Sequence, residues 1–163
     1  MIFVTVGAQM PFDRLTKAVD RWAGERGRSD VFMQTGETSW EPLHASFARV
    51  LPPSEFRAKV RQCSALVAHA GMGSILTALE AGKPILVMPR RAELWETRND
   101  HQVGTAARFA GLGRVTVAAD ESELAHALDN LEKVASSEVI SPSASADLLA
   151  AIAAFLQGGS GAE

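Results

Sequence analysis

The apolar positions of this chain fall into short runs separated by longer amphipathic stretches. Runs of three to five apolar residues bounded by turn residues predict strands that are covered on both faces of a sheet. We expect about six strands, at residues 2–6, 31–34, 48–51, 65–68, 85–88 and 115–117. The stretches between them have helical periodicity, first at residues 12–23. Ser54, which follows two prolines, is expected to cap a second helix.

This alternation of strands and helices predicts an α/β fold. Right-handed crossovers would give a Rossmann-like parallel sheet of about six strands with helices on both faces. Ligand-binding loops in such sheets lie at the carboxyl ends of the strands. We therefore expect Gly7, residues 69–74 and residues 89–100 to meet in one cleft.

The length of 163 residues fits one domain, which we place at residues 1–135. The serine-rich residues 136–145 are interpreted as a linker, residues 146–157 as a C-terminal helix and residues 158–163 as a disordered tail. The apolar positions of that helix allow it either to fold back on the domain or to dock on a second subunit.

Composition excludes several classes of function. The net charge of −3 and the pI of about 5.8 provide no net positive charge that would attract nucleic acid or an anionic membrane. The single cysteine, Cys63, rules out an internal disulfide, fits a reducing compartment and argues against structural zinc. No apolar run reaches the ~18 residues of a membrane span, and the chain opens directly with a strand, so we expect a cytoplasmic protein.

The sequence HAGMGSILTALEAGKPILVMP, which begins at His69, carries the most chemical information. Gly71, Gly73 and Ser74 lie between a predicted strand and helix, where free backbone N–H groups and the helix dipole favour a phosphate. The glycines could instead serve only to turn the backbone. Glu80, near the end of that helix, opposes the dipole; a ribose diol or simple exposure to solvent would account for it.

His69, Arg90 and Asp100 can each have either a structural or a ligand-binding role. His69 is either a core histidine or a contact to phosphate or sugar. Arg90, with Arg91, either clamps a pyrophosphate or a uronic acid carboxylate, or belongs to a solvated basic loop. Asp100 is expected to be the N-cap of the following helix, whether or not it also touches sugar.

The motifs HAGxGS, a glutamate on the next helix, GKPxLVxP and DHQ together resemble the donor-sugar half of the family 28 glycosyltransferases. The resemblance runs from residue 3 to about residue 117. It is strongest to the small soluble subunits of two-component transferases, in bacterial exopolysaccharide synthesis and in dolichol-linked glycan synthesis. It implies the C-terminal half of a GT-B fold.

The resemblance also assigns roles to residues. Glu80 would hydrogen-bond the uridine ribose, and Gln102 would read the hydroxyls of the donated hexose, with Asp100 and His101 beside it in the motif. Gly7 and Gln9 would form the first glycine loop, which faces the cleft and would contact either the acceptor side or the donor phosphate.

The implied activity is inverting transfer of a hexose, of the GlcNAc or glucuronate type, from a UDP-sugar to a lipid-linked acceptor. The chain has no Asp-x-Asp pair to hold a metal, so we expect no cofactor and electrostatic stabilisation of the UDP leaving group. No Asp or Glu can be assigned as the general base. Because the resemblance covers only the donor-binding half of the family's enzymes, it implies a membrane-associated partner subunit that holds the acceptor. The alternative is a UDP-sugar-binding module without catalysis. A dinucleotide-binding enzyme is disfavoured because no G-x-G-x-x-G follows the first strand.

Overall fold

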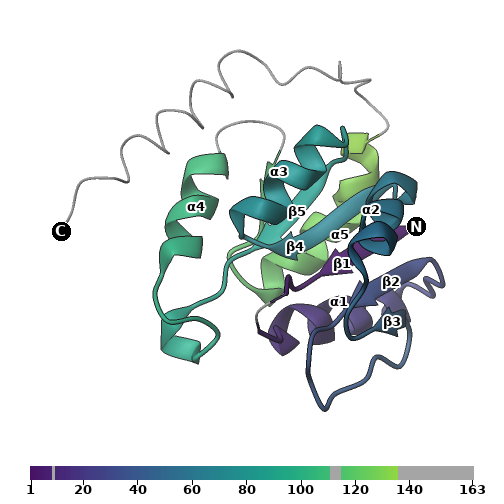
Figure 1. Cartoon of the computed structure of the whole chain (residues 1–163). Helices are drawn as coiled ribbons and strands as arrows, with labels where there is room; N and C mark the ends of the chain where they lie inside the picture. The colour runs from purple at the N-terminus through teal and green to yellow at the C-terminus, as the bar shows by residue number, and fades with distance from the viewer. Residues whose placement is uncertain (9, 111–114, 136–163) are drawn as a thin grey trace.

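The computed structural model of the chain describes residues 1–8, 10–110 and 115–135. Within them, six parallel strands form one sheet in the order β3-β2-β1-β4-β5-β6 (Figure 1). The strands are β1 (Ile2–Thr5), β2 (Val31–Gln34), β3 (Ser46–Ala48), β4 (Ala65–His69), β5 (Ile85–Met88) and β6 (Val115–Val117). The α/β fold with about six parallel strands is therefore confirmed.

Helices cover both faces of this sheet (Figure 1). On one face, α1 (Asp13–Glu25) and α5 (Glu121–Ala135) pack on a core that includes Ile2 and Val4. On the other, α2 (Pro53–Gln62), α3 (Met72–Glu80) and α4 (His101–Ala110) pack on a core that includes Phe3. Successive residues of β1 thus point to opposite cores, as the pleat of a strand requires. A short 3-10 helix, η1 (Ala92–Leu94), lies in the loop after β5.

The strand order creates a switch point between β1 and β4. β1 pairs with β2 on one side and with β4 on the other, with Thr5 opposite both Gln34 and Ala68. The chain leaves β1 toward α1 on one face and leaves β4 toward α3 on the opposite face. The two loops therefore diverge and leave a crevice at the carboxyl ends of these strands, where ligands of parallel α/β sheets bind.

Two local predictions were wrong. The third strand spans Ser46–Ala48 instead of residues 48–51, because its register is fixed by pairing with β2, where Ser46 lies opposite Phe32. Ser54 does not cap α2: the helix already begins at Pro53, whose missing N–H suits a first helical position. The end of α3 was predicted well, since Gly82 has a φ of +63° and terminates the helix just beyond Glu80.

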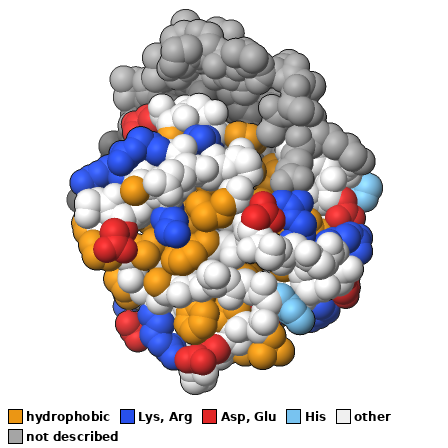
Figure 2. Space-filling model, turned by 90° about the vertical axis from the view of Figure 1, so that its right-hand side faces the viewer, with side chains coloured by type: hydrophobic (Ala, Val, Ile, Leu, Met, Phe, Trp, Pro, Cys, Tyr) orange, Lys and Arg blue, Asp and Glu red, His pale blue; other side chains and the backbone are white. Residues whose placement is uncertain are grey.

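The predicted linker, C-terminal helix and tail lie outside the described residues. Among the residues that are described, no helix is both long and apolar enough to cross a bilayer. The face of the molecule in Figure 2 carries blue and red side chains interspersed with orange ones. Neither positive nor negative side chains predominate on this face.

Candidate functional site

A cavity of about 500 Å³ opens at the switch point between β1 and β4. It is bounded by the loop after β1, the start of α3, the loop after β5 and the first turn of α4. The predicted site residues that line it are Gly7, His69, Gly71, Gly73, Ser74, Arg90 and Gln102. Glu96 and Thr97 also line it, from the expected loop of residues 89–100. Lining residues outside the expected loops and turns are Val6, Ala8, Met10, Phe56 and Thr77. The three loops expected to meet in one cleft do meet here.

The His69 imidazole separates two glycine turns of this cavity. A Cβ on Gly7, which has a φ of +79°, would lie 2.7 Å from Cε1 of His69. A Cβ on Gly71 would also collide with the ring. Both glycines are therefore required by the close approach of the ring, which the sequence alone could not reveal.

The same ring is electrostatically unusual. Burial, together with the charge of Arg90, lowers the pKa of His69 to about 4. Its Nδ1 is buried and has no hydrogen-bond partner within the described residues. The imidazole is thus neutral near pH 7 and too weak a base to take a proton from an alcohol there.

The N-terminus of α3 faces the cavity. The carbonyl of Gly71 accepts the N–H groups of Ser74 and Ile75, so the helical ladder begins at this residue. The N–H groups of the first helical residues have no acceptor within a helix, and the helix dipole adds positive potential there. A Cβ on Gly73 would meet nothing within 4 Å, which leaves the backbone open to a ligand.

Arg90 is a buried residue, with 4% of its surface exposed. Its Nη1 donates to the carbonyls of Pro11 (2.7 Å) and Glu96 (3.1 Å), and its Nη2 donates to those of Val6 (2.9 Å) and Met10 (2.6 Å). The guanidinium therefore ties the loop after β1 to the loop after β5. This geometry does not fit the expected pyrophosphate clamp, because both terminal nitrogens are already occupied by backbone carbonyls.

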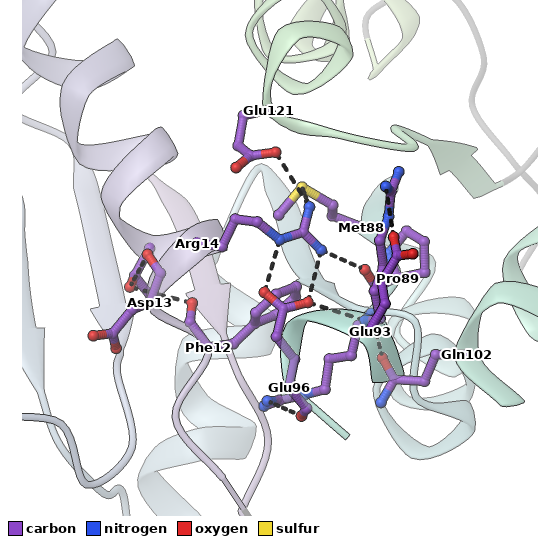
Figure 3. A network of polar contacts seen from close by, with 12 residues as sticks. Phe12, Asp13, Arg14, Met88, Pro89, Glu93, Glu96, Gln102 and Glu121 are labelled. Carbon is purple, nitrogen blue, oxygen red and sulfur yellow. Dashed lines mark hydrogen bonds and ion pairs between the residues drawn. The ribbon is translucent and has the colours of Figure 1, made fainter. Parts of the chain in front are cut away.

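Glu96 is held by Arg14, which lies 82 positions earlier in the chain (Figure 3). The two side chains form a bidentate pair with distances of 2.7 and 2.8 Å, and each side chain is only 12% exposed. Arg14 also donates to Glu121 at the start of α5, and Glu96 accepts the N–H of Arg91. Nothing local in the sequence marks this pair, since it forms only when the fold brings α1 beside the loop after β5.

Gln102 reaches the cavity with a fixed orientation. Its Oε1 accepts the backbone N–H of Arg90 at 3.2 Å. Because that partner is a donor, the amide must place its oxygen there and leaves its NH₂ for another acceptor.

The remaining predicted residues lie elsewhere. Glu80 is exposed at the end of α3 and does not line the cavity; the helix residue that does is Thr77, about one turn earlier. Asp100 and His101 line a separate cavity of about 430 Å³. Asp100 stands directly before α4, but its carboxylate accepts the N–H of Ala92 instead of capping the helix. Gln9 lies outside the described residues.

Arg91 is turned away from the cavity, and its Nη2 donates to the carbonyl of Ala119. Within the described part of the chain, no group of three or more His, Cys, Asp and Glu side chains is placed to hold a metal ion.

Comparison with known proteins gives a consistent assignment. Residues 1–153 match the model of the glycosyltransferase family 28 C-terminal domain. The UDP-N-acetylglucosamine transferase subunit ALG13 of Eremothecium gossypii is 45% identical over 64 residues, which are 39% of this chain and 30% of that relative. The match thus spans less than a third of the relative's length.

Solved structures agree at the level of the fold. The NMR solution structure of ALG13 has a TM-score of 0.59 and 20% identity over 81% of this chain and 85% of that one. The crystal structure of a UDP-glucose: anthocyanidin 3-O-glucosyltransferase in complex with UDP has a TM-score of 0.61 and 13% identity over 98% of this chain and 36% of that one. The extent of the family match, from residue 1 to residue 153, establishes that this chain belongs to the glycosyltransferase family 28 C-terminal domains.

Proposed function

We propose that this chain is the donor-binding part of a UDP-sugar-dependent hexosyltransferase. The observation that carries the proposal is the cavity at the β1–β4 switch point, which brings together several groups that can bind an anion or a hydroxyl. The start of α3 supplies backbone N–H groups, Gln102 supplies an amide NH₂, and Arg90 adds a positive charge. Such a site suits a diphosphate with a hydroxyl-bearing sugar beside it. A UDP complex of a protein with the same fold supports this choice of ligand.

We place the uridine diphosphate along the start of α3 and the hexose next to Gln102. The hexose is of the GlcNAc or glucuronate type; the relative named as a UDP-N-acetylglucosamine transferase subunit supports the first. Gly7, Gly71, Gly73 and Ser74 would lie against the phosphates, with backbone amides in place of a metal ion to stabilise the departing UDP.

The general base for an inverting transfer is not among the described residues that line the cavity. Of its described residues only Glu96 and His69 carry side chains that could take up a proton near neutral pH. Both oxygens of Glu96 are engaged by Arg14, and the pKa of His69 is lowered to about 4. We therefore propose that a membrane-associated partner supplies both the base and the lipid-linked acceptor, at the cytoplasmic side of the membrane.

Calorimetric titration of the purified chain tests the proposal. We expect UDP, UDP-GlcNAc or UDP-glucuronate to bind in the presence of EDTA and NAD not to bind. If no UDP compound binds, the proposal is wrong. If UDP-sugars bind but native membranes with their acceptor lipids support no transfer from the labelled sugar, the chain is a binding module without catalysis.

A further inference from the structure

Arg90 donates to the backbone through both terminal nitrogens, and its positive charge has no carboxylate of the described residues in contact. Both terminal nitrogens donate to two carbonyls each. Phe12 covers the guanidinium, with its ring centroid 4.7 Å from Cζ. No carboxylate of the described residues lies within ion-pair distance of it. A buried cation of this kind is costly unless an anion accompanies it.

The Glu96 carboxylate is the first candidate for that anion, but it is already paired with Arg14. Its two oxygens face Arg14 at 2.7 and 2.8 Å, and only its backbone carbonyl faces Arg90. Glu121 also pairs with Arg14, so the carboxylates of Glu96 and Glu121 both lie against Arg14, and the positive charge that has no carboxylate in contact is that of Arg90. That charge lies beside the cavity, because Arg90 and Glu96 both line it.

The positive charge of Arg90 also affects His69, which lines the same cavity. His69, on the neighbouring strand β4, has its pKa lowered first by burial and then by the positive charge of Arg90. The two residues line the same cavity, so the potential that disfavours a proton on His69 would favour a negative group between them.

We propose that Arg90 is the counter-charge of the ligand phosphates, and that it acts through its electric field without donating a hydrogen bond to them. This inference rests on the proposed binding of a uridine diphosphate and adds the origin of its charge selectivity. This role differs from that of an arginine whose guanidinium hydrogen-bonds a phosphate directly. Lysine would replace such a phosphate-binding arginine only poorly, but in place of Arg90 it would keep the positive charge that attracts the phosphates.

The test is calorimetric titration of the whole chain with uridine, UMP and UDP, which differ in charge but share the nucleoside. The variants are Arg90→Lys, which keeps the charge, and Arg90→Gln, which removes it; both lose most of the four carbonyl contacts. In Arg90→Gln we expect the ratio of UDP to uridine affinity to fall about tenfold or more, because a charge a few Å away in a partly buried site acts on this scale. In Arg90→Lys that ratio should stay within about threefold of the wild-type ratio, since the charge remains.

The possible outcomes separate this inference from the proposed function. If both variants weaken uridine, UMP and UDP equally, Arg90 is only structural and the inference is overturned. If Arg90→Gln does not fold, as judged by circular dichroism, Arg90→Lys still decides: a UDP to uridine ratio that collapses in this variant overturns the inference. If the wild-type protein binds uridine and UDP equally well, the inference about Arg90 is overturned but a nucleoside-binding site remains. If the wild-type protein binds neither, the proposed function is overturned as well.

Discussion

The His69 imidazole occupies the space that a side chain on Gly71 would need. The ring reaches across the sheet edge from β4 and also limits Gly7, in the loop after β1. Two glycine turns that belong to different loops are thus shaped by one aromatic ring. This contact explains why a histidine that ends an apolar strand is followed by glycine two residues later.

The first prediction concerns Gly71. Gly71→Ala should lower the free energy of unfolding by about 2 kcal/mol, because the methyl group would overpack against the His69 ring. Gly73→Ala is the matched control: a Cβ there meets nothing within 4 Å, so stability should hold or rise by up to about 1 kcal/mol. Urea denaturation measures both. A Gly71→Ala protein as stable as the wild type would show that the ring moves aside freely.

The second prediction concerns pH. The pKa of His69 is lowered to about 4 in the folded protein, against about 6.5 for an unfolded chain. The unfolded state therefore binds the extra proton between these values, and stability should decrease as pH falls from 6.5 to 4, by about 3 kcal/mol at most. His69→Asn, which cannot titrate, should lose this part of the pH dependence.

Denaturation of both proteins at pH 7, 5.5 and 4.5 measures the difference. Asp30 and Asp129, whose pKa values are also lowered, remain in both proteins and cancel in the comparison. Parallel pH profiles for the two proteins would contradict the assignment to His69.

The third prediction concerns Glu96. Glu96→Ala should destabilise the protein by about 2 kcal/mol, because it removes a bidentate charge-assisted pair and leaves the largely buried Arg14 with the Pro89 carbonyl and the half-exposed Glu121. Glu93→Ala, in the same loop, breaks an exposed pair with Arg91 at 3.5 Å and should change stability by less than about 0.5 kcal/mol. Thermal unfolding distinguishes them. Equal effects would mean that the fold does not depend on the Arg14 contact.

Local pattern was sufficient for the sheet but not for the polar contacts of the site. Short apolar runs located five of the six strands closely, because burial on both faces leaves a clear signal. Arg90 could not be read in this way: from the sequence it is a charged loop residue, and its burial depends on carbonyls of Val6, Met10 and Pro11, about 80 positions away. The Arg14–Glu96 pair was missed for the same reason.

Glu80 shows a different limit. The resemblance assigns the ribose contact to an acidic residue of α3, but the rotation of that helix decides which of its side chains faces the cavity. A residue three positions earlier points into the cavity, and Glu80 itself lies in solvent at the helix end. The rotation of α3 about its axis is fixed by its buried residues, Ile75 and Ala78. A match to a sequence motif does not specify this rotation.

The fourth prediction concerns Gln102. Its oxygen is committed to the Arg90 N–H, so only its NH₂ remains for the sugar. Gln102→Ala should therefore weaken UDP-sugar binding about tenfold, the effect of one hydrogen bond, and leave UDP nearly unchanged. Val103→Ala, at the exposed neighbouring position, should affect neither ligand. Equal losses for UDP and UDP-sugar in the Gln102 variant would indicate a structural role.

The last prediction compares Thr77 with Glu80. The Thr77 hydroxyl donates to the carbonyl of Gly73 at 2.7 Å, which leaves its oxygen to accept a hydrogen bond from a ligand in the cavity. A ribose hydroxyl is such a donor, so Thr77→Val should weaken UDP binding by about 1 kcal/mol, roughly fivefold, without loss of helix packing. Glu80→Ala should leave UDP affinity unchanged, because this carboxylate does not line the cavity. Calorimetric titration of both variants checks the pair. A loss of affinity confined to Glu80→Ala would return the ribose contact to Glu80 and require the end of α3 to lie closer to the ligand than it does here.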